Sequence, residues 1–427
     1  MSQRIVIVGS GFAGFWAALS ARRLINLTLE KGIAEAANVE VVVIAPDANL
    51  VMRPRLYEPN PADMSAPVDD VYRACGVRFV YGIVDTIHTA NHEIEMVDRA
   101  GVRSTMSYNK LILAAGSRVV HPDIPGLTNH AFSVDQIEDA VKLDRHLQSL
   151  SSQPPSKARN TVVVCGGGFT GIEVAAELPG RLRAILGSDA ALHVIIVERS
   201  SAIGPDLGPA PRPHVVQALA DLGVETRLSA SIASLDASGV TLSTGERIEA
   251  LTAVWTAGVA ATPLAGQIPG AKDALGRLRV DKELRVPAAP DVFAAGDAAC
   301  AAADGDGGHD VKMTCQHAGP LGKVAGYNAA AELLGVPVLP YSQPVYRLCL
   351  DLGAAGSVVG EGWDVNVLSA GRAAKPVKQF INATLIYPPR ADAVEAFAAA
   401  DPVPQGFDPA ARHPDLGRFL KEHGIVV

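Results

Sequence analysis

The chain has 427 residues, which predicts two or three domains rather than one. Hydrophobic residues make up 48% of it and charged residues 19%, a balance that is typical of a packed globular protein and excludes a disordered or fibrous chain. The net charge of −8, with no block of lysine and arginine, argues against nucleic acid as a partner.

The N-terminal residues "MSQRIVIVGSGFAG" enter a strand by the fourth or fifth position, so we expect no signal peptide. No window reaches ~18 uninterrupted apolar residues, which predicts that no helix spans a membrane. The cysteines are odd in number, far apart and without a C-x-x-C pair, a pattern that predicts a reducing compartment, buried free thiols and no metal site. They are Cys75, Cys165, Cys300, Cys315 and Cys349.

Two glycine-rich loops follow apolar strands and open apolar helices. The strand "RIVIV" leads through the first loop into "FWAALSARRL", and the strand "TVVVC" leads through the second into "IEVAAEL". In a G-x-G-x-x-G loop the first glycine makes the turn, the second admits a pyrophosphate and the third lets helix and strand pack closely. We therefore predict two dinucleotide sites, one at Gly9, Gly11, Phe12, Ala13 and Gly14 and one at Gly166, Gly168, Phe169, Thr170 and Gly171.

The residue that ends the next strand in each half bears on which nucleotide binds. In the first half the strand "VEVVVIA" ends at Ala45, so either the nearby Asp47 or backbone groups hold the adenosine ribose. In the second half Glu198 ends "HVIIVE", where a carboxylate hydrogen-bonds a ribose 2′-hydroxyl and repels a 2′-phosphate. Arg199 follows directly and would have the opposite effect. We favour NADH, with NADPH as the alternative.

Three further segments carry a resemblance. "VFAAGDAA" runs from a strand into Gly296 and Asp297, "KLILAAGS" contains Ala115 and Gly116, and "AVWTAGV" contains Gly258. With the two loops, these segments resemble flavoproteins with two dinucleotide-binding domains. The resemblance implies an α/β fold with two Rossmann-like domains, FAD on the first loop, NAD(P)H on the second, and an FAD ribityl hydroxyl bonded to Asp297. Alternatively, Asp297 is the N-cap of a helix over "AACAAA".

The same resemblance implies the domain organisation. The NAD(P)H-binding domain, residues 121–284, is inserted in the FAD-binding domain, residues 1–120 and 285–340, and residues 341–427 form a small C-terminal α+β part. Relatives that reduce disulfides need two cysteines five positions apart in the region that is Asp47–Pro61 here, or a C-x-x-C pair, and this sequence has neither. We therefore expect electrons to pass from the flavin directly to an external acceptor.

A closer resemblance rests on "MRPRLYE", "GGGFTGIEVAAEL", "VWTAGV", "FAAGDAA" and "CQHAGPLGKVAGYNA". These segments resemble type II NADH dehydrogenases, which are single-subunit, FAD-containing NADH:quinone oxidoreductases. The resemblance implies that Glu173 lies near nicotinamide and flavin, that Arg53 flanks the flavin, that Val84 passes the adenine, and that Lys378 or Lys375 stabilises charge on the ring. The alternatives are a first-turn glutamate stabilised by the helix dipole, an exposed loop arginine and solvated lysines.

The segment "TCQHAGPLG" resembles the quinone-binding motif of that family, Q-x-A-x-Q-Q-G. The resemblance implies that the backbone of Gln316, His317 and Ala318 approaches the FAD ring, with the first two side chains at the edge of an acceptor pocket. Pro320 and Leu321 replace two glutamines; Pro320 suits a first helical turn, and Leu321 makes the pocket more apolar. His317 would give a proton to a reduced quinone or, alternatively, lie on the solvent side of the turn.

The C-terminal tail has only one short stretch with a helical apolar face, "PDLGRFLKEHGIVV", so we expect weak peripheral membrane contact or none. We predict a cytoplasmic NADH:quinone oxidoreductase that uses FAD, with attachment to the inner membrane face as the alternative and a homodimer as one permitted assembly. Two other functions stay open. One is a soluble reductase for a small redox protein such as a ferredoxin, against which the acidic charge argues; the other is a slow-turnover, NADH-binding signalling flavoprotein.

Overall fold

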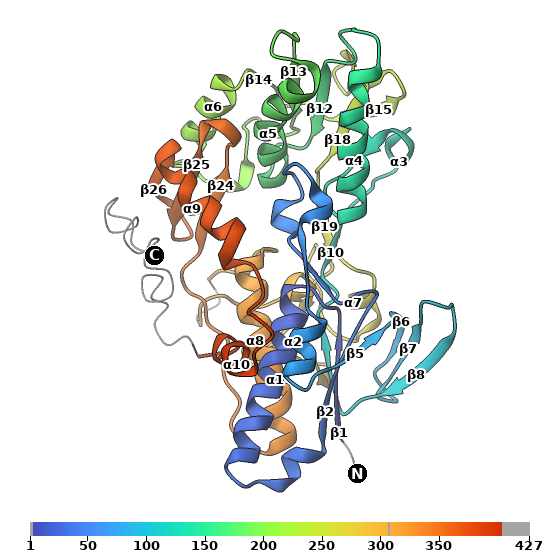
Figure 1. The fold of residues 1–427 in the computed structure, drawn as a ribbon, viewed down its shortest axis with the longest axis vertical. Helices are drawn as coiled ribbons and strands as arrows, with labels where there is room; N and C mark the ends of the chain where they lie inside the picture. The colour runs from blue at the N-terminus through green and yellow to red at the C-terminus, as the bar shows by residue number, and fades with distance from the viewer. Residues whose placement is uncertain (1–2, 306–307, 404–427) are drawn as a thin grey trace.

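A computed structural model describes residues 3–305 and 308–403 of the protein. Figure 1 shows an elongated molecule with a layered α/β unit at each end and the orange-red C-terminal segments lying along both. Each unit is built on a parallel sheet. The predicted α/β class with two Rossmann-like units is therefore confirmed.

The first sheet combines strands from two separate parts of the chain: β1 (Gln3–Val8), β2 (Val39–Ala45), β5 (Arg78–Tyr81), β9 (Lys110–Leu113), β21 (Arg285–Val286) and β22 (Ala289–Ala294). Their order is β21-β22-β9-β1-β2-β5, and all pairs except β21 with β22 are parallel. The central strands β1 and β9 are apolar runs because both faces of the sheet are covered.

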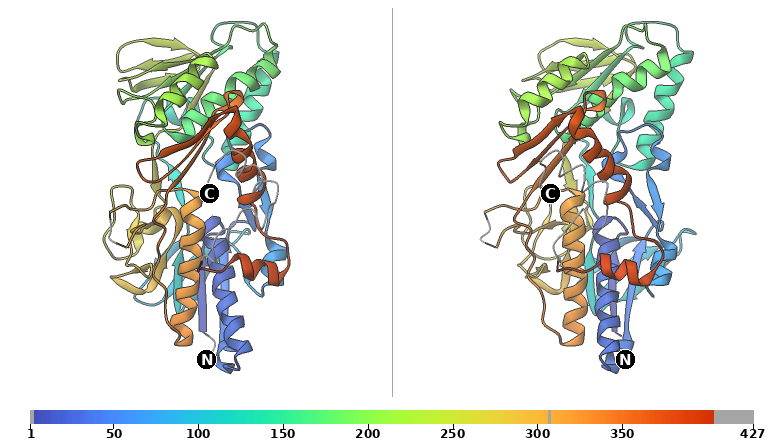
Figure 2. Two further views of the ribbon diagram at one scale, coloured as in Figure 1. Left: turned by 90° about the vertical axis from the view of Figure 1, so that its left-hand side faces the viewer. Right: turned by 60° about the vertical axis from the view of Figure 1, so that its left-hand side comes forward.

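Helices α1 (Phe12–Glu30) and α8 (Cys315–Leu334) lie side by side against this sheet (Figures 1 and 2). Their contact depends on glycine. A Cβ at Gly322 would lie 2.2 Å from the carbonyl oxygen of Ala13, and one at Gly326 would lie 2.0 Å from that of Ala17. The two helices therefore touch backbone to backbone, which places the start of α8 next to the first glycine loop.

The second sheet has five parallel strands in the order β11-β18-β12-β13-β14: β11 (Ala131–Phe132), β12 (Thr161–Cys165), β13 (His193–Val197), β14 (Val224–Arg227) and β18 (Thr252–Trp255). Three helices pack against it: α4 (Ile137–Ser149), α5 (Phe169–Leu186) and α6 (Arg212–Asp221). An antiparallel sheet lies beside it: β15 (Ile232–Asp236), β16 (Gly239–Leu242) and β17 (Arg247–Glu249). These elements support our proposal that residues 121–284 form an inserted domain.

Two antiparallel strands, β10 (Ser117–Val119) and β19 (Val259–Ala261), form the crossing between the two units. A second antiparallel sheet projects from the first unit: β6 (Ile83–His88), β7 (Glu93–Val97) and β8 (Arg103–Ser107). The shorter elements are β3 (Asn49–Val51), β4 (Ser65–Pro67), α2 (Asp69–Ala74), α3 (Leu127–His130), α7 (Leu264–Gln267), β20 (Leu278–Arg279) and β23 (Ala299–Cys300).

The C-terminal part consists of β24 (Arg347–Asp351), β25 (Ser357–Glu361), β26 (Asn366–Gly371), α9 (Lys375–Phe380) and α10 (Ala393–Ala399). Its antiparallel sheet and α9 lie along the second unit (Figure 2). The approach to α5 is close, because a Cβ at Gly353 would lie 2.2 Å from the carbonyl oxygen of Ala176. The stretch "PDLGRFLKEHGIVV", to which the prediction of membrane contact refers, lies outside the described residues.

Candidate functional site

The two glycine loops have matching geometry. Gly9 and Gly166 adopt φ angles of 107° and 117°, a region that L side chains rarely enter. A Cβ on Gly14 would lie 1.9 Å from the carbonyl oxygen of Gly9, and one on Gly171 would lie 1.9 Å from that of Gly166. Only glycine at these positions lets each helix start against its own strand.

The middle glycine of each loop faces open space. A Cβ at Gly11 or Gly168 would meet no atom within 4 Å, and as helix N-caps both leave the first-turn N–H groups without a side-chain acceptor from the cap. A close backbone approach and free amides at a helix start are what a pyrophosphate requires. The loops therefore fit FAD and a nicotinamide dinucleotide, with Phe12, Ala13, Phe169 and Thr170 in the first turns of α1 and α5.

Asp297 lies beside the first loop. Its Oδ2 accepts hydrogen bonds from Ser117 Oγ (2.6 Å) and Arg53 Nη1 (3.3 Å). A Cβ on the preceding Gly296 would lie 2.8 Å from the Cβ of Ala13, at the start of α1. The carboxylate is thus close to the residues that fit the pyrophosphate, as its proposed role toward the FAD ribityl chain requires.

The alternative role of Asp297 as the N-cap of a helix is wrong. Residues 296–298 form one 3-10 turn, and Ala299–Cys300 then pairs as β23 with β20. No helix covers "AACAAA", because strand pairing in the folded chain prevails over the helix propensity of alanine.

Arg53 is bonded to acidic partners and is not a free loop arginine. Its guanidinium donates to the side chain of Asp135 and, through Nε, to the Asp135 carbonyl oxygen (3.1 Å). It also donates to Ser117 Oγ (2.9 Å) and Asp297. Asp135 accepts in turn from the Val119 N–H (3.1 Å), which lies in the crossing strand β10. Arg53 therefore ties the segment after β3 to the connection between the two units, and its contact with FAD stays a prediction.

Glu198 is held rigidly at the end of β13. Its two carboxylate oxygens accept from the N–H of Gly167 (2.7 Å), in the second glycine loop, and from the N–H of Ser200 (2.8 Å). Although burial raises the pKa of Glu198, these N–H groups hold it below its ordinary value. The result is a fixed anion next to the second dinucleotide site.

A buried ion pair joins α5 to the C-terminal part. Lys378 Nζ on α9 donates to Glu173 Oε1 on α5 at 2.8 Å, and the two side chains are 6% and 13% exposed. Burial lowers the pKa of Lys378, but the charge of Glu173 more than offsets this and the pKa is raised; burial also raises the pKa of Glu173. The alternatives are therefore wrong: Lys378 is not solvated, and Glu173 lies beyond the first turn of α5.

Asp351, at the end of β24, makes further hydrogen bonds to this pair and its neighbours. Its N–H donates to Glu173 Oε1 (3.0 Å). Its carboxylate accepts from Lys375 Nζ (2.5 Å) and from Tyr57 OH (3.0 Å). The Tyr57 ring lies 5.8 Å from Lys378 Nζ, within reach of a cation–π contact. Lys375 is thus paired as well, and it is not a solvated lysine.

The segment "TCQHAGPLG" differs from its prediction in three positions. Helix α8 begins at Cys315, so Pro320 lies inside the helix and not in its first turn. Leu321 is fully buried in the core and lines no exposed pocket. The side chain of Gln316 donates to the Arg347 carbonyl oxygen (2.7 Å) and accepts from the Arg347 N–H (3.0 Å), so it is bound to β24.

His317 is fully buried, so its predicted solvent position is wrong. Its Nδ1 pairs with Thr314 Oγ1 (3.0 Å), and its ring lies parallel to those of Tyr346 and Trp363 at 6.1 and 6.0 Å. Burial lowers the pKa of His317 to about 4. The imidazole is therefore neutral near pH 7, which argues against the predicted donation of a proton. Ala318, the next residue, lies against Gly296.

The other predicted residues lie in strands or in the loops that follow and join them. Asp47 accepts from the Asn49 N–H (3.0 Å), which closes the loop after β2. Val84 is buried in β6. Ala115 and Gly116 join β9 to β10, and Gly116 and Gly258 adopt φ angles of 70° and 78° at corresponding ends of the crossing strands. The nucleotide contacts of these residues stay predictions.

The five cysteines are free thiols. Burial raises the pKa of both Cys165 and Cys349 to about 12, so neither is a ready nucleophile. Within residues 3–305 and 308–403, no group of three or more His, Cys, Asp or Glu side chains could hold a metal ion. In the same part of the chain, no helix is both long enough and apolar enough to cross a membrane.

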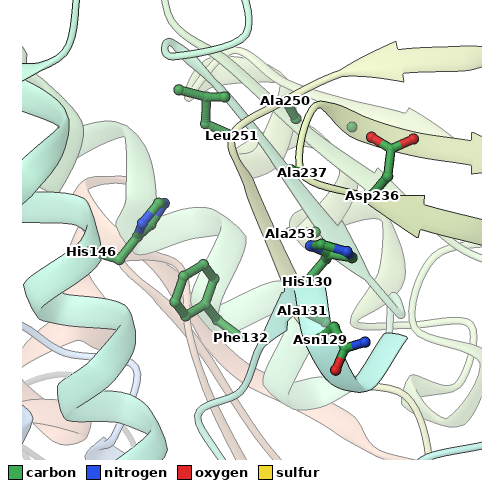
Figure 3. Close-up of a pocket in the computed structure, with 11 residues that line it drawn as sticks. Asn129, His130, Ala131, Phe132, His146, Asp236, Ala237, Ala250, Leu251 and Ala253 are labelled. Atoms are coloured by element: carbon green, nitrogen blue, oxygen red, sulfur yellow. The ribbon is translucent and has the colours of Figure 1, made fainter. Parts of the chain in front are cut away.

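A cavity of about 200 Å³ lies in the second unit between β11, α4 and the β15–β16 turn (Figure 3). His146 and Phe132 stack in it with ring centroids 4.3 Å apart, and His146 Nε2 pairs with Thr252 Oγ1. Asp236 is bonded to Arg247 and to residue 238. The side chains of His146 and Asp236 are thus paired within the fold, and the cavity contains none of the predicted site residues.

Sequence reasoning missed four residues of the site: Tyr57, Ser117, Asp135 and Asp351. One signal was present for Asp351, since a carboxylate in the apolar strand "RLCLD" must find partners when it is buried. The other three are a tyrosine, a serine and an aspartate in loops or at strand ends, where their residue types are common.

Residues 3–322 match the family model described as pyridine nucleotide-disulphide oxidoreductase. An NADH dehydrogenase-like protein of Mycobacterium tuberculosis is 44% identical over 92% of this chain and 98% of its own length. A type II NADH:quinone oxidoreductase of the same organism is 30% identical over 69% of this chain and 67% of its own.

A solved structure shares the fold. The structure of NDH2 from Plasmodium falciparum in complex with NADH matches with a TM-score of 0.74 and 15% identity, and the match covers 94% of this chain and 98% of that one. The likeness to this structure concerns the fold, whereas the family model and the two mycobacterial relatives show the family. The chain belongs to the pyridine nucleotide-disulphide oxidoreductases and is an FAD- and NADH-dependent oxidoreductase within that family.

Proposed function

We propose that this chain oxidises NADH through FAD and passes both electrons directly to a quinone-like acceptor. The reaction takes up NADH, one proton and the quinone, and it yields NAD⁺ and the quinol. FAD, when bound, supplies the hydride and electron chemistry. The observation that supports the proposal most directly is the buried pair of Lys378 and Glu173, which joins α5, the helix after the second glycine loop, to the C-terminal part.

Lys378 can stabilise a reduced flavin because its positive charge is permanent. Its pKa is raised, so it keeps its proton at every pH at which the protein would work. A fixed ammonium group in a water-poor site stabilises negative charge that develops during reduction more strongly than the same group in water. The Glu173 carboxylate holds this ammonium in place at 2.8 Å.

The acceptor is proposed to be external because the chain offers no internal one. The segment Asp47–Pro61 contains no cysteine, and the sequence has no C-x-x-C pair. A quinone is proposed because one relative bears the name type II NADH:quinone oxidoreductase. The site of its ring is not assigned to Leu321 or Gln316, whose side chains are packed or bonded elsewhere.

A comparison of two lysine variants tests the proposal. K378M should slow NADH-dependent reduction of a short-chain quinone about 100-fold, the usual effect of losing one preorganised electrostatic stabiliser. The matched control K142M removes a lysine of α4 that is 68% exposed, and it should leave the rate unchanged. Both proteins must retain FAD, which is measured from the visible spectrum. Wild-type protein that reduces no quinone, or a K378M variant with the wild-type rate, would overturn the proposal.

We also propose that any contact with a membrane is weak and peripheral. Fractionation at low and high salt tests this, because a salt-sensitive association is electrostatic and a salt-resistant one is apolar. Quinone reductase activity that remains wholly in the supernatant under both conditions would exclude the contact.

A further inference from the structure

We propose that Asp351 is a positioning residue, which keeps Lys378 on Glu173 by binding the second ammonium group of the same helix, Lys375. The inference rests on the proposed function, since it concerns how the charge that serves the flavin is held. If this is so, strand β24 of the C-terminal part contributes to a site whose two glycine loops lie in the first and second units.

Two ammonium groups compete for the same carboxylates. Lys375 and Lys378 are three residues apart on α9, so both side chains project from one face of the helix. Opposite them on α5 stand Glu173 and Glu177, four residues apart and also on one face. Nothing in this arrangement alone decides which lysine pairs with Glu173.

Asp351 decides the pairing because it lies between the two helices. Its carboxylate accepts a hydrogen bond from Lys375 Nζ at 2.5 Å, and the Gly353 carbonyl oxygen accepts one from the same ammonium group at 3.0 Å. Its own N–H donates to Glu173 Oε1 at 3.0 Å, which fixes the oxygen that Lys378 approaches. Lys375 is thereby bound to β24, and Lys378 is the lysine that pairs with Glu173.

The remaining bonds of Asp351 strengthen this assignment. Its Oδ1 accepts from the Gly353 N–H (2.8 Å), and its Oδ2 accepts from Tyr57 OH (3.0 Å). The carboxylate is therefore fully engaged, and its side chain is only 7% exposed. Through Tyr57 it also orients the ring that lies 5.8 Å from Lys378 Nζ. Lys378 is held by the carboxylate of Glu173, this ring and the Cys349 carbonyl oxygen (3.4 Å).

The test compares D351N in two backgrounds. D351N keeps the size of the side chain and the backbone N–H but removes the charge that binds Lys375. In the wild-type background it should slow reoxidation of the NADH-reduced flavin by menadione about tenfold and shift the flavin midpoint potential. In a K378M background it should change neither quantity further, because the ammonium through which Asp351 acts is already gone.

Removal of the competing lysine provides a second arm. The double variant D351N/K375M should recover the wild-type rate to within about twofold, since no second ammonium then competes for Glu173. The control D364N, at an exposed aspartate in the β25–β26 turn, should match wild type. If D351N does not retain FAD, the single variant K375M tests the proposal instead. It frees Asp351 to compete for Lys378, so it should also shift the flavin midpoint potential.

The proposal is overturned if D351N is equally impaired with and without Lys378, or if D351N/K375M is no better than D351N. Either result would mean that Asp351 acts on the fold and not through Lys378. These outcomes are separate from the proposed function. A wild-type protein that reduces no quinone would refute that function, while the midpoint potentials of the same variants would still test the role of Asp351.

Discussion

The side-chain amide of Gln343 donates to the carbonyl oxygen of Gln316 at 3.2 Å, and this oxygen is the one that Pro320 leaves without a partner. In a regular helix the N–H of residue 320 would bond to the oxygen of residue 316, but proline has no N–H. Gln343, from the segment before β24, thus replaces a missing helical hydrogen bond. It allows a proline inside α8 close to the first glycine loop.

The variant Q343A should therefore lose about 1–2 kcal/mol of unfolding free energy, the usual cost of leaving a partly buried carbonyl group unpaired. Urea denaturation followed by circular dichroism measures this loss. In a P320A background the N–H is restored, and the effect of Q343A should become smaller by more than half. Equal losses in both backgrounds would show that Gln343 does not serve the oxygen that Pro320 leaves free.

His317 should make the protein less stable in acid. Its folded pKa of about 4 lies below the ordinary value of 6.5, so the unfolded chain binds the proton more tightly. The stability that the neutral imidazole contributes is fully present above pH 6.5 and is lost as the pH falls to about 4. The loss amounts to about 3 kcal/mol, at 1.36 kcal/mol for each pKa unit.

Urea denaturation at several pH values between 4 and 7 tests this prediction. H317F should flatten the dependence on pH, whereas H214N, at an exposed histidine of α6, should leave it as in wild type. A slope that is the same in H317F and wild type would assign the acid sensitivity to other groups.

Glu198 should set the preference for NADH over NADPH. E198Q keeps the shape of the side chain but removes the negative charge. One of the two oxygens becomes an NH2 group, which cannot accept a hydrogen bond from the backbone. The ratio of kcat/KM for NADPH to that for NADH should rise at least tenfold, because a 2′-phosphate would no longer face a fixed anion. E246Q, at a carboxylate that is 42% exposed, serves as the control. A wild-type enzyme that prefers NADPH would contradict this account.

The contact between α1 and α8 should tolerate no side chain at Gly326. G326A places a Cβ 2.0 Å from the Ala17 carbonyl oxygen, so the helices must separate, at a cost of about 3 kcal/mol or more. Gly180 offers the matched control because it lies inside α5 with no atom within 4 Å of its Cβ position. G180A should raise the unfolding free energy by up to about 1 kcal/mol. Thermal unfolding of the two variants should therefore move in opposite directions.

The sequence predicted the parts of the fold and site that depend on local patterns. The loops at Gly9 and Gly166 combine strand, turn and helix signals within some twenty residues, so their positions and roles follow from neighbours in the chain. The same holds for the acidic residue at the end of β13, since Glu198 is placed by its strand alone.

The parts that depend on distant contacts could not be predicted. His317 lies between Gln316 and Ala318 in a segment with no strong hydrophobic pattern, and only the packing of Tyr346 and Trp363 over it makes it buried and neutral. The sequence predicts a first helical turn at Pro320, whereas α8 begins at Cys315, because the residue that makes a proline tolerable there, Gln343, lies outside the helix. Asp351 likewise gains its role only when α5 and α9 meet around it.

A single-turnover experiment tests the central claim most directly. The purified FAD-loaded protein is reduced anaerobically with NADH and mixed in a stopped-flow instrument with a short-chain quinone, a ferredoxin or air-saturated buffer. The account predicts that the flavin absorbance returns rapidly with the quinone only, and at least tenfold more slowly with the other two acceptors. Fast reoxidation by ferredoxin, or a reduced flavin that persists in the presence of quinone, would contradict it.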